Sequence, residues 1–119
     1  MTTLLNIKKV IAEILDIQED EIDQETYLVR DLGAESIDLL ELAVSLNSVF
    51  GKKINEADIF LTNLRQYQAV SEKTGEQPVK CLLDAYPFLE KQRVEEILAD
   101  LDNGPVLKIK DIVRYIDHS

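Results

Sequence analysis

The residues best placed to do chemistry are a serine and three acids in the stretch "DLGAESIDLLEL", residues 31–42. Ser36 stands between a glycine-containing acidic loop and the first turn of an apolar-striped helix. A serine there predicts either a helix N-cap or an exposed hydroxyl for covalent attachment of a phosphodiester. The cap by itself gives no reason for the acids Glu35, Asp38 and Glu41, which we expect on one exposed side of the helix.

The sequence lacks the partners that would make Ser36 an enzymatic nucleophile. His118 is the only histidine and lies beside the last residue of the sequence, and no G-x-S-x-G turn surrounds Ser36. Cys81 is the only cysteine, so no intrachain disulfide forms, and its apolar neighbours predict a buried structural thiol. The sequence has no glycine-rich phosphate loop and no Cys/His zinc spacing. We therefore expect a protein that is not an enzyme.

Charge indicates which partners suit the chain. The 119 residues carry a net charge of −10. Residues 1–60 hold 5 basic and 13 acidic side chains, a balance of −8, whereas residues 61–119 hold 8 and 10, a balance of −2. This acidity argues against nucleic acid or an anionic membrane as the main partner and favours proteins with a basic patch. The acidic run over residues 16–25 does not fit an EF-hand loop, so we expect solvated charge and no metal site, with loose divalent binding left open.

Apolar periodicity predicts an all-α fold. Apolar residues recur at three- and four-residue spacing in most of the chain, and no segment alternates apolar and polar residues as a strand would. On the second helix, Ile37, Leu40 and Val44 join Leu39, Ala43, Leu46 and Phe50 in one broad apolar face. The expected elements are a helix over 3–16, a long acidic loop over 17–35 whose apolar side chains enter the core, a second helix from Ser36 to Gly51, a short third helix over 54–60 and a last helix around 109–116.

Residues 61–105 have a different character and read as an inserted helical segment. We expect one helix over about 61–73, a second that ends before Pro87 and a third that ends at "DNGP". The segment is rich in large apolar side chains, so we expect a folded layer packed on the second, third or last helix. The whole chain, 1–119, is then a single domain with a core of 1–60 and 106–119 and an insertion at 61–105.

"DLGAESID" resembles the phosphopantetheine-attachment motif of the acyl carrier proteins, D-L-G-A-D-S-L-D. Glu35 stands where that family usually has Asp, and Ile37 where it usually has Leu. The first helix, the acidic loop, Glu41, "VFGKKINEADI" and "IKDIVRYI" also fall where the family has its elements. The resemblance covers residues 1–60 and 106–119, and it implies an acyl-carrier-like four-helix bundle with two or three extra helices before the last one.

The resemblance implies a function and a cofactor. A phosphopantetheinyl transferase would place the 4'-phosphopantetheine of coenzyme A on Ser36, and the thiol of that arm would carry acyl groups as thioesters between enzymes of fatty acid or lipid biosynthesis. Glu35, Asp38 and Glu41 would contact basic docking patches on acyl-transferring and acyl-modifying enzymes. No signal peptide or membrane span is evident, so we expect a cytoplasmic monomer.

Two departures leave alternatives open. Asn47 and Ser48 stand late in the second helix, where the family often has more acids, and residues 61–105 have no counterpart in typical carriers. The first hypothesis is a carrier of acyl chains, including one that serves a specialised pathway outside bulk fatty acid synthesis. A carrier of polyketide or aminoacyl intermediates, and an interaction module that is never loaded, remain alternatives.

Overall fold

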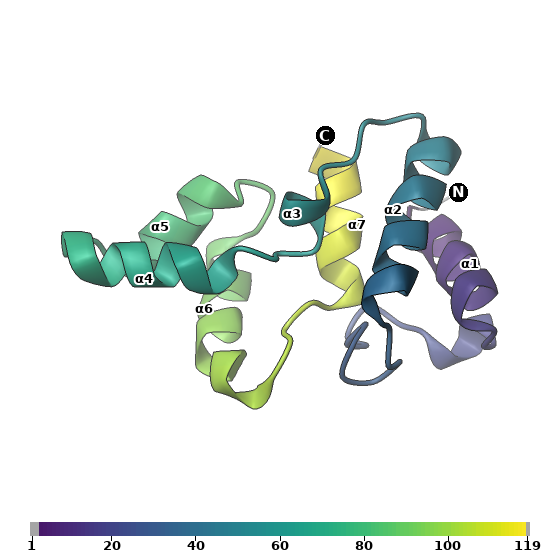
Figure 1. The fold of residues 1–119 in the computed structure, drawn as a ribbon, viewed down its shortest axis with the longest axis horizontal. Coiled ribbons are helices and arrows are strands. Elements are labelled where there is room, and N and C mark those ends of the chain that lie inside the picture. The colour runs from purple at the N-terminus through teal and green to yellow at the C-terminus, as the bar shows by residue number, and fades with distance from the viewer. Residues whose placement is uncertain (1–2, 119) are drawn as a thin grey trace.

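The computed structural model describes residues 3–118, and its helices form a bundle with an arm to one side (Figure 1). The bundle consists of α1 (Thr3–Leu15), α2 (Ser36–Phe50), α3 (Glu56–Ile59) and α7 (Ile109–His118). Helix α1 packs on α2 and on α7, and α3 packs on α7. The expected all-α bundle with extra helices is confirmed. Among residues 3–118 the only backbone pairing of strand type is a single antiparallel bridge between Tyr27 and Lys108, and no helix there is long and apolar enough to cross a membrane.

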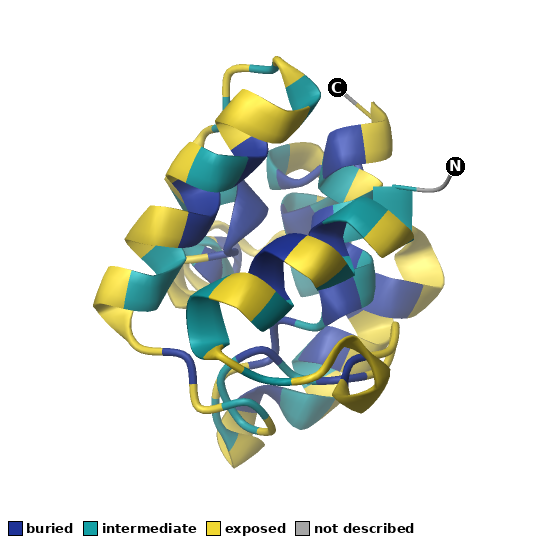
Figure 2. Ribbon diagram, turned by 90° about the vertical axis from the view of Figure 1, so that its right-hand side faces the viewer, coloured by how far each residue is buried: buried dark blue, intermediate teal, exposed yellow. Residues whose placement is uncertain are grey.

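Helix boundaries follow local sequence signals. Helix α1 turns Ile7, Val10 and Ile11 into the core, as its spacing predicts, and Figure 2 shows exposed turns alternating with buried ones along the helices. Helix α2 ends at Gly51, whose φ of 62° lies in the left-handed region that glycine enters without a steric penalty. The third helix is shorter than expected and is capped by the Asn55 side chain, which accepts a hydrogen bond from Asp58 N at 3.1 Å.

One expectation about α2 is wrong. Its apolar residues do not form a single buried face: Leu42, Ala43 and Leu46 are buried, whereas Ile37, Leu40 and Val44 are 64%, 55% and 65% exposed. The bundle has only α1, α3 and α7 around α2, so these helices cover part of its circumference. A contiguous apolar stripe is left facing water.

The acidic loop before α2 is anchored as expected. It contains one short 3₁₀ turn, η1 (Glu19–Glu21), and it buries Ile22 and Leu28 almost completely. Leu28 N donates to Leu107 O at 3.1 Å, and Ile109 N donates to Thr26 O at 3.0 Å. The loop is therefore fixed to the segment that leads into the last helix.

The insertion consists of α4 (Leu64–Thr74), α5 (Pro78–Ala85), α6 (Lys91–Asp100) and the 3₁₀ turn η2 (Leu101–Asn103). Helix α4 packs on α5 and α5 packs on α6, as the apolar content predicts. The three helices extend beside the bundle (Figure 1), and the insertion contacts the last helix, one of the three helices on which it was expected to pack, through Arg93 and Phe88. One hydrophobic cluster includes buried residues of both parts. Cooperative folding of the chain as a single domain stays a prediction.

A buried ion pair joins the insertion to the last helix. Arg93 of α6 reaches both carboxylate oxygens of Asp111 through Nε and Nη2, each at 2.7 Å, and Asp111 is fully buried. Arg93 Nη2 also donates to Val106 O at 2.9 Å, and Asp111 Oδ2 accepts from Lys108 N at 2.9 Å. Nearby, the rings of Phe88 and Tyr115 meet edge to face with centroids 5.2 Å apart.

Candidate functional site

The candidate site is the loop-to-helix corner at the start of α2. Gly33 has a φ of 71°, and its N–H donates to Val29 O at 2.9 Å. Ala34 N donates to Leu28 O at 3.3 Å, and the Ala34 side chain is buried. The "DLGA" sequence therefore folds back on itself, since glycine adopts the left-handed conformation and alanine fits the small buried space. The corner fixes the direction in which α2 begins.

Ser36 is the first residue of α2, and it is exposed. The interpretation of Ser36 as the N-cap is wrong, because Glu35 occupies the cap position with extended backbone. The cap is completed by Asp38, whose Oδ2 accepts a hydrogen bond from Glu35 N at 2.8 Å. Within residues 3–118 the Ser36 hydroxyl has no hydrogen-bond partner, so it does no structural work that a modification would disturb.

This corner fits a phosphodiester on Ser36. The first amides of α2 have no acceptor within the helix, and the helix dipole places partial positive charge beside the hydroxyl. These features favour a negative group at the start of the helix.

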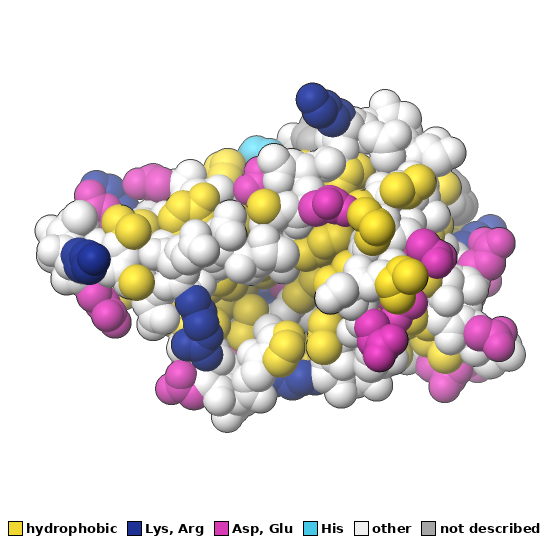
Figure 3. Space-filling model, in the orientation of Figure 1, with side chains coloured by type: hydrophobic (Ala, Val, Ile, Leu, Met, Phe, Trp, Pro, Cys, Tyr) yellow, Lys and Arg dark blue, Asp and Glu magenta, His cyan; other side chains and the backbone are white. Residues whose placement is uncertain are grey.

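The three predicted docking acids lie on and just before the first turns of α2, but the expectation that all three share one exposed side is wrong for Asp38. Glu35 and Glu41 are exposed, whereas Asp38 is partly buried and serves the cap. Asp38 and Leu15 of α1 line the same small cavity, and Glu41 and Glu13 line the same surface hollow. Across residues 3–118, none of the three acids forms an ion pair with a lysine or arginine. Figure 3 shows acidic side chains spread over the bundle side of the molecule, at the right.

The exposed stripe of Ile37, Leu40 and Val44 also belongs to this surface, and the sequence interpretation missed it. The stripe runs along α2 from the residue after Ser36, and acids border it. A contiguous apolar patch rimmed by polar residues is typical of a protein interaction surface. The signal was present in the sequence, because apolar residues of α2 spread too widely around the helix for one core face.

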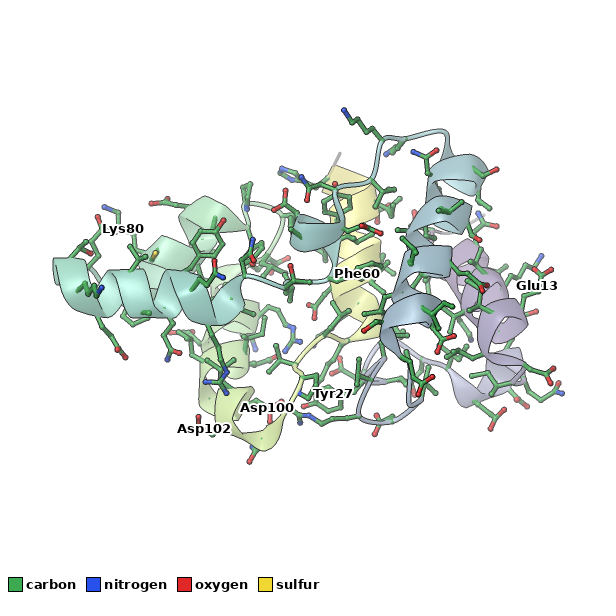
Figure 4. The ribbon with its side chains drawn as sticks, in the orientation of Figure 1. Glu13, Tyr27, Phe60, Lys80, Asp100 and Asp102 are labelled. Carbon is green, nitrogen blue, oxygen red and sulfur yellow. The ribbon has the colours of Figure 1, made fainter. Side chains whose placement is uncertain are left out.

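A second contact group ties the attachment loop to the insertion. The Asp100 carboxylate accepts from the Tyr27 hydroxyl and from Arg30 Nη1 at 3.1 Å, and Arg30 Nη2 donates to Gly104 O at 3.1 Å (Figure 4). The Arg30 guanidinium lies 4.1 Å from the centre of the Tyr27 ring. Hydrogen bonds from Arg30, Tyr27 and Asn103 hold the pKa of Asp100 well below its usual range. These contacts therefore fix the loop before Ser36 to Asp100 and Gly104 of the insertion.

Comparisons with known proteins agree with this geometry. The family model described as "Phosphopantetheine attachment site" matches residues 6–67. The acyl carrier protein of Thermotoga maritima is 40% identical over 53 residues, which are 44% of this chain and 65% of that protein. The acyl carrier protein of Campylobacter lari is 38% identical over 53 residues, 44% of this chain and 69% of that protein. No solved structure gives a significant match.

Proposed function

The chain belongs to the family of carrier proteins with a phosphopantetheine attachment site, and on that premise we propose that Ser36 is the residue that bears the arm. The group in this family is 4'-phosphopantetheine, attached covalently, and the protein is a carrier and not an enzyme. The observation that carries the assignment to Ser36 is its place at the first position of α2, exposed and without a hydrogen-bond partner within residues 3–118. Ser45 and Ser48 lie further along the same helix, away from its positive end.

The loading reaction needs only a hydroxyl from this chain. The Ser36 oxygen forms a bond to the phosphorus that carries the pantetheine, and the pyrophosphate bond of coenzyme A breaks. Adenosine 3',5'-bisphosphate leaves, and the hydroxyl proton passes to a base of the transferase. When bound, the arm supplies a terminal thiol that carries an acyl group as a thioester. The chain contributes an accessible oxygen, a helix end that tolerates the phosphodiester and a surface that enzymes recognise.

Loading is tested by intact-mass measurement after incubation with coenzyme A and a broad-range phosphopantetheinyl transferase. One phosphopantetheine should be added to the wild type and to Ser48→Ala, and none to Ser36→Ala. Ser48 is a matched control because it is an exposed serine on the same helix. An adduct that persists in Ser36→Ala would assign the arm to another residue, and no adduct with several transferases would favour an unloaded interaction module.

The pathway is the finer part of the proposal. The chain spans 65% of the Thermotoga relative, and that protein's printed name refers to acyl groups. We assign this chain to acyl transfer in fatty acid or lipid biosynthesis, in the cytoplasm, with partners that present basic patches to Glu35, Asp38 and Glu41. Recovery of polyketide or aminoacyl thioesters on the arm of the native protein, by mass spectrometry, would replace that assignment.

A further inference from the structure

Two sets of contacts fix the loop over residues 28–35, which leads to Ser36. The first set is made by the backbone: Leu28 N donates to Leu107 O at 3.1 Å, and Ala34 N donates to Leu28 O at 3.3 Å. The second set is made by the Arg30 side chain, which leaves the loop and reaches the insertion. The conformation in which the loop presents Ser36 therefore depends partly on residues about 70 positions further along the chain.

The Asp100 carboxylate, at the end of α6, accepts hydrogen bonds from three side chains. Its Oδ1 lies 3.1 Å from Arg30 Nη1 and 3.0 Å from Asn103 Nδ2, and its Oδ2 accepts from the Tyr27 hydroxyl (Figure 4). Arg30 Nη2 lies 3.0 Å from the same Oδ2, and the Arg30 and Asp100 side chains are each only 21% exposed. A charge-assisted contact that is partly shielded from water is stronger than one on the open surface.

Gly104 completes the surroundings of the Arg30 guanidinium. Its carbonyl oxygen accepts from Arg30 Nη2 at 3.1 Å, and a Cβ at this position would lie 3.4 Å from Arg30 Nε. Within residues 3–118, Arg30 Nε is buried and has no hydrogen-bond partner, which costs free energy. The arrangement persists because the contacts with Asp100 and Gly104 outweigh that cost, so the position of Arg30 depends on these partners.

We propose that Asp100 is a positioning residue for the loading of Ser36, because it holds the loop through Arg30 and Tyr27 in the conformation that a transferase uses. The proposal rests on the proposed function, in which Ser36 bears the arm. The Ser36 oxygen must lie in line with the pyrophosphate bond of coenzyme A, and a misplacement of about 1 Å can cost about a hundredfold in rate. Asp100 lies outside residues 6–67, which match the family model, so the insertion takes part in a reaction of the carrier bundle.

The expected effect of Asp100 acts through the population of loop conformations. Without the carboxylate, Arg30 is released and the loop samples other conformations, so the apparent affinity of the transferase falls with the fraction of chains that present Ser36. Asp100→Ala should therefore raise the KM of the transferase for this chain about tenfold and leave kcat within about twofold. Asp102→Ala is the matched control, since it removes the same charge two residues away, where the Asp102 side chain is 99% exposed and lies 3.9 Å from Arg65.

Three further measurements show whether the effect passes through the loop. Tyr27→Phe keeps the ring and removes one donor to Asp100, so it should raise the KM less, in the same direction. In an Arg30→Met background, Asp100→Ala should change the KM by less than about twofold, because both residues act through one contact. Amide exchange needs no loading: the Gly33 and Ala34 amides should exchange at least about tenfold faster in Asp100→Ala than in the wild type.

The outcomes separate this proposal from the function on which it rests. An unmodified mass of the wild type would overturn the loading of Ser36 itself. Normal loading of the wild type, with the same KM in Asp100→Ala and Asp102→Ala, would overturn the positioning role and leave the carrier function intact. Additive effects in the double variant, or unchanged exchange of the loop amides, would overturn it as well. If circular dichroism shows that Asp100→Ala is unfolded, Tyr27→Phe decides, and a wild-type KM in that variant would count against the proposal.

Discussion

The acids of this protein serve two different purposes in two regions. Around Ser36, Glu35 and Glu41 are exposed and pair with no cation within residues 3–118. At the junction of the bundle with the insertion, Asp100 pairs with Arg30 at 3.0 Å and Asp111 pairs with Arg93 at 2.7 Å. Glu25 is held by Lys108 and Lys110 at 2.9 and 3.0 Å. Four of the eight basic residues of the second half of the chain, Arg93, Lys108, Lys110 and Arg114, form ion pairs at this junction or with the nearby Glu25.

This difference in pairing means that the negative field outside the protein is strongest near the attachment point. Acids that have a cation within the fold contribute little field outside it, whereas unpaired exposed acids project a field that steers basic partners. The exposed stripe of Ile37, Leu40 and Val44 runs through the same surface, and on the proposed function we expect it to supply apolar contact after the encounter. We therefore expect mutations of the buried Arg93–Asp111 pair at the junction to affect stability and mutations on the α2 surface to affect recognition.

The largest effect is expected from breaking the buried ion pair. Arg93→Met leaves the fully buried Asp111 carboxylate without its cation and should lower the free energy of unfolding by about 3–5 kcal/mol. Arg114→Met is the matched control, since its pair with Glu90 is exposed and should cost at most about 1 kcal/mol. Urea unfolding measures both. Equal losses in the two variants would show that the junction does not depend on the Arg93–Asp111 pair, whereas recovery in Arg93→Met/Asp111→Leu would confirm that the unpaired charge is the cause.

The next effect concerns the recognition surface, and its cost in stability should be no more than about 1 kcal/mol, because only Glu35 lies at the cap position of α2. Glu35→Lys with Glu41→Lys should slow loading by the transferase about tenfold at low salt, because the steering field near Ser36 is reversed. The difference should shrink as salt rises, since exposed charges are screened over about 10 Å at 0.1 M. Asp38 is left intact because it completes the helix cap. Glu72→Lys with Glu76→Lys, two exposed acids in the insertion, makes the same change of net charge, and a similar slowing in that control would assign the effect to net charge alone.

Sequence patterns predicted the elements well because their signals are local. The start of α2 at Ser36, its end at Gly51 and the helical nature of residues 61–105 all follow from caps, breakers and periodicity. The arrangement of the insertion depends instead on long-range pairs such as Arg93 with Asp111, which are 18 residues apart and carry no local signature. From the sequence alone, a charged residue in α6 such as Arg93 is expected to face solvent, so its buried pair with Asp111 could not be predicted.

Only part of the candidate site could be predicted, because only part of it has a local signal in the sequence. The acids and Ser36 are recognisable from type and spacing, and the structure places them together at one end of α2. Which of Ile37, Leu39 and Leu40 faces the core depends on how many helices surround α2, and that number is set by the tertiary fold. The width of the apolar face of α2 is visible in the sequence, but which of its residues stay exposed depends on the assembled chain.

A smaller effect should appear on acidification. Hydrogen bonds from Lys108 and Lys110 lower the pKa of Glu25 to about 2, and the pKa of Asp100 is also lowered. A carboxylate with a lowered pKa in the folded state contributes stability above its unfolded pKa of about 4 and loses that contribution as the pH falls toward the folded value. The melting temperature should therefore fall by a few degrees between about pH 4 and pH 2. Asp100→Asn should weaken the dependence of the melting temperature on pH. An unchanged dependence in that variant would show that Asp100 does not contribute to it.

The smallest effect is expected at Ser36 itself, and it separates the roles of two neighbouring residues. A serine that capped α2 would cost about 0.5–2 kcal/mol when replaced by alanine. Glu35 holds the cap position and the Ser36 hydroxyl has no partner within residues 3–118, so Ser36→Ala should change the free energy of unfolding by no more than about 0.5 kcal/mol. Asp38→Ala removes the acceptor of the Glu35 N–H and should cost about 0.5–1.5 kcal/mol. Urea unfolding of the unmodified proteins resolves the two, and a larger loss at Ser36 than at Asp38 would show that the hydroxyl stabilises the start of the helix.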